Sequence, residues 1–160
     1  MKKFGVIGIG NPLRCDDGIG IILLEKIKEQ KKELPNEVEF IDGGTGGMSL
    51  LHIFACFDSI LLIDAVQMNK KPGIYKIFTA DDIINNKNNF FLSTHEHQLQ
   101  QVIEMSKYLG ELPKHFFIFG VQTKDTSYGK NLTNDLQRKI NILLKSLQDE
   151  IKKIFISLKL

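Results

Sequence analysis

The segment GIGNPLRCDDGIG, from Gly8 to Gly20, decides the fold because it joins two stretches with different apolar patterns. It follows the continuous apolar run from Phe4 to Ile7, which is typical of a buried strand. It precedes the run from Ile21 to Ile27, in which apolar residues recur at helical spacing. The segment is therefore predicted to lead from a strand into a helix. In open α/β sheets, ligands bind beyond such strand ends.

The chemistry of this loop argues against two common nucleotide sites. Leu13 stands where a dinucleotide fingerprint needs its third glycine, and the end of the loop lacks the Gly-Lys-Ser/Thr of a P-loop. The adjacent carboxylates of Asp16 and Asp17 would repel a phosphate. The loop therefore suits a cation, a proton transfer or helix capping. For Asp16 an N-cap role stays open, and Asp17 could simply complement the helix dipole.

Length and composition indicate one globular domain spanning residues 1–160. The chain has 42% hydrophobic and 25% charged residues, which is enough for a single sheet covered on both faces. Its net charge is +2, from 21 basic and 19 acidic residues, and gives no electrostatic footprint for nucleic acid. No apolar run approaches the roughly 18 residues of a membrane span, and no signal-peptide pattern opens the chain. We expect a cytoplasmic protein with free thiols at Cys15 and Cys56.

Alternating strand and helix signals predict a three-layer α/β/α domain. Its twisted, mostly parallel sheet would have about five strands, with helices on both faces. The strands are expected at residues 4–7, 38–41, 59–63, 74–78 (an edge strand) and 116–121. The helices are expected at residues 18–30 and 48–55, from the Ser93-Thr94 cap to about 109, and from about 133 onward, where an apolar stripe can pack on the sheet.

Acids follow the predicted strands in a regular way. Asp42 opens the glycine-rich loop after the second strand, and Asp64 ends the apolar third strand. In a mostly parallel sheet, Asp17, Asp64 and His95 can lie on one edge. Two carboxylates and one imidazole would leave coordination positions open on a divalent ion. These residues are therefore a candidate metal site.

Each candidate also has a structural alternative. His95 could be a surface or capping histidine, and His97 competes with it for any ligand role. Asp42 could form an Asx-turn with its glycine loop. For Asp64 we favour a role in the site, because an acid that ends an apolar strand must reach a cleft or find a partner. Cys15 could be a nucleophile, but two carboxylates follow it directly and no histidine is fixed next to it in the sequence.

Four motifs in order carry a family resemblance that covers nearly the whole chain. They are Gly8-Ile9-Gly10-Asn11 with Asp16-Asp17-Gly18-Ile19-Gly20, then Asp42-Gly43-Gly44-Thr45-Gly46-Gly47, then Ile63-Asp64-Ala65, and Ser93-Thr94-His95 with Leu99. This set resembles the hydrogenase maturation proteases. These endopeptidases trim the C-terminus of the large subunit of nickel-iron hydrogenases.

The resemblance implies roles for specific residues. Asp17, Asp64 and His95 fall on the metal-contacting positions of the family. Asp42 falls on a further acid, and either Asp17 or Asp42 would serve as the catalytic base of an aspartyl-type endopeptidase. The glycine-loop residues Gly43, Gly44 and Thr45 would bind substrate.

The resemblance also implies a partner and a metal. The partner would be the hydrogenase large-subunit precursor. We also expect a monomer, and the composition predicts no nucleic-acid or membrane partner. Nickel would be recognised in the substrate, with no permanent organic cofactor. Exposed loops, the asparagine patch at residues 85–89 and the stretch at residues 124–130, are the expected specificity elements.

Two departures from the family pattern and two alternatives remain. His97-Gln98 stand where a small or apolar residue is common, and Thr123 stands where a proline is common. A non-enzymatic nickel-binding maturation chaperone could use the same three ligands. A peptidyl-tRNA hydrolase also opens with Gly-x-Gly-Asn-Pro, as in Gly8 to Pro12, but that match ends at Leu13.

Overall fold

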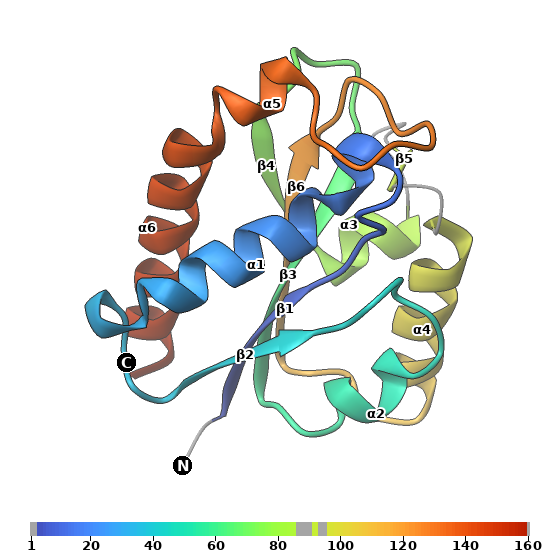
Figure 1. Cartoon of the computed structure of the whole chain (residues 1–160). Coiled ribbons are helices and arrows are strands. Elements are labelled where there is room, and N and C mark those ends of the chain that lie inside the picture. The colour runs from blue at the N-terminus through green and yellow to red at the C-terminus, as the bar shows by residue number, and fades with distance from the viewer. Residues whose placement is uncertain (1–2, 86–90, 93–95, 160) are drawn as a thin grey trace.

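The computed structural model describes residues 3–85, 91–92 and 96–159. Strands and helices alternate along most of it (Figure 1). The strands are β1 (Phe4–Gly8), β2 (Val38–Asp42), β3 (Ser59–Gln67), β4 (Tyr75–Thr79), β5 (Phe91–Leu92) and β6 (His115–Gln122). The α-helices are α1 (Ile19–Glu29), α2 (Leu50–Phe54), α3 (Ala80–Asn85), α4 (Glu96–Tyr108), α5 (Asn134–Gln137) and α6 (Ile140–Lys159), and the 3₁₀ turns are η1 (Cys15–Gly18) and η2 (Lys31–Glu33).

The sheet is mostly parallel, as predicted. Its main path is β2-β1-β3-β6-β4, and β5 pairs with β3 off this path. Strands β1, β2, β3 and β6 run parallel to one another, so their carboxyl ends meet at one edge. The edge strand β4 is antiparallel to β6, and β5 is antiparallel to β3. The two-residue β5 was not predicted, because so short an apolar pair carries no periodicity.

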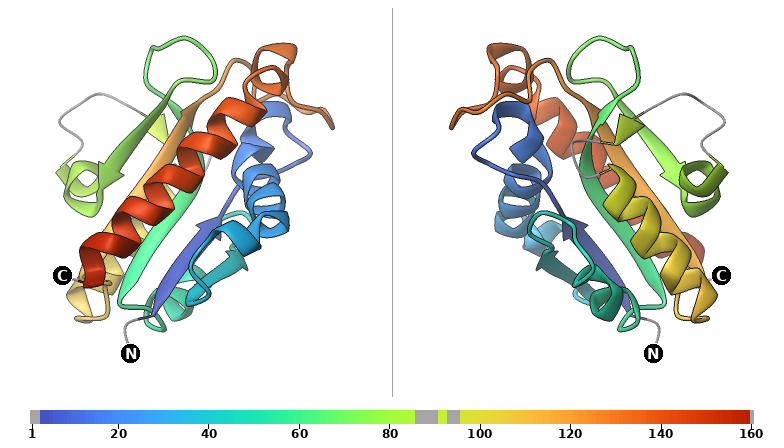
Figure 2. Two further views of the ribbon diagram at one scale, coloured as in Figure 1. Left: turned by 90° about the vertical axis from the view of Figure 1, so that its left-hand side faces the viewer. Right: turned by 90° about the vertical axis from the view of Figure 1, so that its right-hand side faces the viewer.

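Helices cover both faces of the sheet, which confirms the three layers (Figure 2). Along β3, Leu61, Ile63 and Ala65 belong to the core that α1 and α6 close. The alternate residues Leu62 and Val66 belong to the core that α2, α3 and α4 close. Successive side chains of a strand point to opposite faces. A strand that is apolar on both sides is therefore sandwiched between two helical layers.

The C-terminal helical region is divided, where one helix was expected. Helix α5 ends at Gln137 and α6 begins at Ile140. The predicted apolar stripe is nevertheless confirmed, since Leu143, Leu147 and Ile151 are buried against the sheet. Within the described part of the chain, no helix combines the length and apolarity needed to span a membrane.

Helix α3 was not predicted, although its start has a recognisable signal. The Thr79 side chain accepts a hydrogen bond from the Asp82 N–H (3.3 Å), and the Asp82 carboxylate accepts one from the Thr79 N–H (2.8 Å). This reciprocal pair is a capping box with aspartate in place of the usual glutamate. The sequence Thr-x-x-Asp was therefore the available indication.

Candidate active site

Three segments are tied together at the carboxyl edge of the parallel strands. The Gly43 N–H donates to the Gly8 carbonyl (2.8 Å), and the Gly10 N–H donates to the Gly44 carbonyl (2.9 Å). The Ile9 N–H donates to the Ile63 carbonyl (3.0 Å). The loops after β1 and β2 and the end of β3 thus form one framework, which holds the predicted acids on a single edge.

Close backbone packing brings the start of α1 onto this framework. A Cβ atom on Gly20 would overlap the carbonyl oxygens of Ile9 and Ile63, and one on Gly8 would overlap the backbone of Gly20. Only glycine permits this approach. The turn η1, which carries Asp17, consequently lies beside β3, where Asp64 follows Ile63.

Asp17 is fully buried and only half satisfied. Its exposed fraction is 0%. Its Oδ2 accepts a hydrogen bond from the Asn11 N–H (3.0 Å), while Oδ1 is buried with no hydrogen-bond partner among the described residues. An unsatisfied buried acceptor costs about 1–3 kcal/mol. The free oxygen is therefore a natural position for a ligand that supplies positive charge.

Asp64 is also buried, with 1% of its surface exposed. Its Oδ1 accepts a hydrogen bond from the Ala65 N–H (2.8 Å). Asp64 lies two residues from Leu62 and two from Val66 along β3, so the three side chains share one face of the strand. This is the face that α4 covers. Helix α4 begins at Glu96. His95, the expected third ligand, lies outside the described residues, so its meeting with Asp64 stays a prediction.

Asp42 stands at the exposed rim of the same edge. It ends β2 in register with Gly8. Its Oδ1 accepts a hydrogen bond from the Gly44 N–H (2.8 Å), which confirms the Asx-turn interpretation. That turn fixes the carboxylate beside the glycine loop. Asp42 is exposed to solvent, whereas Asp17 and Asp64 are buried.

The glycine loop divides into packing and exposed positions. Gly43 is buried, and a Cβ there would press on the side chains of Ile7 and Ile9. Gly44 and Thr45 are exposed, and Gly44 has φ +60°, a left-handed conformation that favours glycine. Of the three expected substrate-binding residues, Gly44 and Thr45 thus face solvent. Gly43 holds the loop against β1.

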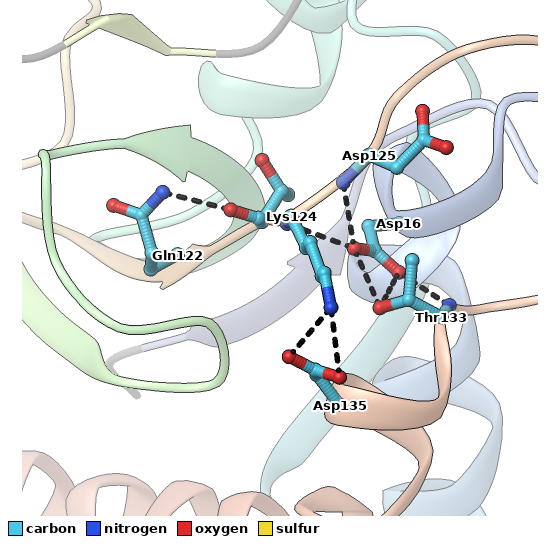
Figure 3. Close-up of polar contacts among 7 residues, drawn as sticks. Asp16, Gln122, Lys124, Asp125, Thr133 and Asp135 are labelled. Carbon is cyan, nitrogen blue, oxygen red and sulfur yellow. Dashed lines mark hydrogen bonds and ion pairs between the residues drawn. The ribbon is translucent and has the colours of Figure 1, made fainter.

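Asp16 has a role that sequence reasoning missed. It is fully buried, and its carboxylate accepts hydrogen bonds from the N–H groups of Lys124 (2.9 Å), Asp125 (3.1 Å) and Thr133 (2.8 Å) (Figure 3). The Thr133 hydroxyl donates a further bond (3.0 Å). Neither η1 nor α1 has a side-chain cap, so the N-cap interpretation is wrong. Asp16 instead anchors the long polar loop after β6.

The same polar loop, residues 123–133, runs along the first loop, which is the segment between β1 and α1 (residues 9–18). The Cys15 N–H donates to the Gly129 carbonyl (2.9 Å), and the Gly129 N–H donates to the Leu13 carbonyl (2.9 Å). The Arg14 side chain donates to the Thr126 carbonyl (3.0 Å), and its guanidinium lies 5.2 Å from the centre of the Tyr128 ring. The expected specificity element at residues 124–130 is therefore fixed beside the candidate site.

The donor set fits a metal ion only in part. No group of three or more histidine, cysteine or acidic side chains in the described ranges has a metal-binding arrangement. Those ranges contribute the carboxylates of Asp17 and Asp64, and carboxylate oxygens are a ligand type that divalent ions accept. A nickel site also favours imidazole, and the predicted imidazole is that of His95.

Comparisons with known proteins agree with the fold and the motifs. The family model described as HycI, hydrogenase maturation protease, matches residues 21–150, a range that starts after Asp17. The Hydrogenase 2 maturation protease of Escherichia coli is 36% identical over 120 residues, which cover 72% of this chain and 70% of that protein. The HupD hydrogenase expression/formation protein of Bradyrhizobium diazoefficiens is 31% identical over 136 residues, which cover 84% of this chain and 70% of that protein.

A solved structure shows the same architecture. The hydrogenase maturating endopeptidase HybD from Escherichia coli superposes with a TM-score of 0.80 at 28% identity, over 94% of this chain and 93% of that chain. The HycI maturation protease from Thermococcus kodakarensis, at 21% identity and a TM-score of 0.72, shares the fold. With the family model covering most of the chain, the protein belongs to the hydrogenase maturation proteases, a family of endopeptidases.

Proposed function

We propose that this endopeptidase removes the C-terminal extension of a nickel-iron hydrogenase large-subunit precursor after nickel has been inserted. The observation that carries the proposal is the buried, unpartnered Oδ1 of Asp17 beside the end of β3, where Asp64 is also buried. Two carboxylates held at one edge would complete the coordination of a metal that arrives with the substrate. The family membership supplies the reaction class.

Dependence on nickel follows from the incompleteness of the site. Asp17, Asp64 and His95 would leave positions open on the ion, so firm binding needs ligands from the precursor. The interaction would then be strong only for a precursor that already contains nickel. Cleavage becomes a check on metal insertion, because the binding energy that positions the peptide bond depends on the metal.

The two candidate bases, Asp17 and Asp42, differ in solvent exposure, and this difference favours a different role for each. Asp17 is buried and suits metal contact, whereas Asp42 is exposed at the rim and suits contact with water. We assign Asp42 as the general base. It takes a proton from a water molecule as the oxygen attacks the peptide carbonyl, and the proton then passes to the leaving amine as the C–N bond breaks.

The glycine loop narrows the choice of oxyanion donors. The N–H groups of Gly10, Gly43, Gly44 and Gly46 all donate within the protein. Across the described residues, no acceptor is bonded to the N–H groups of Thr45 or Gly47. A developing oxyanion needs donors that are already placed and not engaged elsewhere. Of the loop amides, those of Thr45 and Gly47 meet this requirement.

Intact-mass analysis of a nickel-loaded cognate precursor tests the proposal. Incubation with the purified protein should shorten the precursor by one C-terminal peptide, and Asp64→Asn should abolish this change. Asp149→Asn is the matched control, because Asp149 is an exposed acid of α6 that pairs with Lys145. Tight nickel binding without cleavage of the cognate precursor would overturn the proposal in favour of a nickel-binding chaperone.

A further inference from the structure

We propose that Asp16 is a positioning residue for precursor binding. This inference rests on the proposed function. Its buried carboxylate fixes the loop at residues 123–133 against the first loop, and the fixed loop presents a binding surface to the precursor. Asp16 touches no reacting atom in this account. It acts through the loop that it anchors.

The carboxylate of Asp16 is saturated by donors from this loop. Oδ2 accepts from the N–H groups of Lys124 and Asp125, and Oδ1 accepts from the N–H of Thr133. The hydroxyl of Thr133 lies 3.0 Å from both oxygens. Hydrogen bonds to an ionised acceptor are stronger than neutral ones. With these bonds filled, Asp16 has little capacity left for a metal or substrate, unlike its neighbour Asp17.

The anchor holds both ends of a loop that has no helix or strand of its own between Gln122 and Asn134. Lys124 and Asp125 lie at its start and Thr133 at its end, and all three meet at Asp16 (Figure 3). The Lys124 ammonium also pairs with Asp135 of α5 at 3.1 Å, on the surface. An exposed ion pair contributes little. The Asp16 N–H also donates to the Asp125 carbonyl (3.0 Å), so the start of the loop has a backbone bond as well. Among the side chains of the described residues, the Asp16 carboxylate is the one that accepts hydrogen bonds from both ends of the loop.

The fixed loop carries a large exposed side chain next to the first loop. Tyr128 is 84% exposed and Leu13 is 60% exposed. The bond between the Gly129 N–H and the Leu13 carbonyl keeps their two segments adjacent. Exposed aromatic and apolar side chains beside a site are suited to hold a polypeptide. Loosening of the loop would separate Tyr128 from Leu13 and so weaken this binding surface, while Asp17 and Asp64 would stay in place.

Steady-state kinetics of Asp16→Asn, with the nickel-loaded precursor, test the inference. The amide places an N–H donor against backbone N–H donors, so both ends of the loop should loosen, while the backbone bonds of Asp125 and Gly129 to the first loop remain. We expect KM to rise about tenfold, with kcat within about threefold of the wild type, because binding rather than chemistry is lost. Thr133→Val removes only the hydroxyl donor and should give a smaller rise in KM. Leu147→Ala destabilises the distant α6 core and should leave KM unchanged.

Limited trypsin digestion tests whether Asp16 holds the loop, and it does not require the protein to cleave a precursor. Cleavage after Lys124 and Lys130 should be faster in Asp16→Asn than in the wild type, while Leu147→Ala should leave the pattern of the loop unchanged. Equal loop cleavage in Asp16→Asn and the wild type would overturn the anchoring. This readout remains valid if the wild type trims no precursor, so failure of the proposed function can be told apart from failure of the anchor.

A covalent substitute for Asp16 completes the test. A Cβ built on Gly129 lies 2.6 Å from the Cys15 sulfur, within reach of a disulfide after a small shift. Asp16→Asn with Gly129→Cys and Cys56→Ser should regain the wild-type KM when oxidised and lose it when reduced. Peptide mass mapping verifies the link to Cys15. A wild-type KM in Asp16→Asn, or a linked variant whose KM stays high, would contradict the positioning role.

Discussion

The carboxylate of Asp16 accepts hydrogen bonds from both the N–H and the hydroxyl of Thr133, a residue 117 positions later in the chain. Its neighbour Asp17 keeps one buried oxygen without a hydrogen-bond partner among the described residues. Two adjacent acids in one loop therefore do different work. Asp16 organises the surroundings of the site, and Asp17 is available to a ligand.

Removing the charge of Asp17 or Asp64 should stop processing without unfolding the protein. Asp17→Asn and Asp64→Asn keep the side-chain volume but remove the negative charge that we propose contacts the metal, so we expect trimming rates to fall at least about 100-fold. Initial rates by intact mass measure the loss, and far-UV circular dichroism verifies the fold. Rates within threefold of the wild type for both variants would exclude these acids as ligands.

Gly20→Ala should destabilise the whole domain. The new methyl group would overlap the carbonyl oxygens of Ile9 and Ile63, which are backbone atoms and cannot move aside as a flexible side chain would. Overpacking of this kind costs about 1–3 kcal/mol or more. Urea denaturation measures the free energy of unfolding. Gly47→Ala is the control, since a Cβ at Gly47 has no neighbour within 4 Å. A Gly20→Ala protein as stable as the control would refute the close approach of α1.

Thr79→Ala should weaken the start of α3. The change removes the hydroxyl that accepts from the Asp82 N–H, and loss of such a cap costs about 0.5–2 kcal/mol. Asp81→Ala at the same turn removes an exposed ion pair with Lys107, which is worth about 0–1 kcal/mol, and leaves the Thr79–Asp82 hydrogen bonds in place. Thermal or urea unfolding compares the two variants. A larger loss for Asp81→Ala would contradict the capping box.

The loop after β6 also contains a carboxyl group with a perturbed titration. The side-chain hydrogen bond from Ser127, followed by its backbone N–H, holds the pKa of Asp125 below its usual 3.8. A depressed folded-state pKa stabilises the protein above the unfolded pKa, and this contribution is lost as the pH falls through the folded value. NMR titration of Ser127→Ala should move the pKa of Asp125 upward. An unchanged pKa of Asp125 would show that the Ser127 hydroxyl does not lower it.

Much of the architecture was predictable because it follows from local patterns. The apolar run at residues 59–63 reads as a strand buried on both faces, and β3 is buried on both faces. The alternation at residues 74–78 reads as an edge strand, and β4 lies at the edge. Strand and helix alternation predicts a parallel sheet, and a parallel sheet brings Asp42 and Asp64 to one edge.

The rest depends on contacts between distant segments. No local pattern says that Asp16 binds the N–H groups of Lys124, Asp125 and Thr133, because those donors meet the carboxylate only after the sheet has formed. The sequence supports a cap equally well, since aspartate before a helix is common in both situations. The break between α5 and α6 is likewise invisible in an apolar stripe that continues across it.

The most direct measurement compares cleavage of nickel-loaded and nickel-free forms of the same large-subunit precursor by the wild-type protein. Intact mass of the subunit, followed over time, reports both reactions. A metal-checked protease that uses Asp17 and Asp64 should shorten the loaded form and leave the nickel-free form intact. Equal cleavage of both forms would contradict recognition of the substrate's nickel.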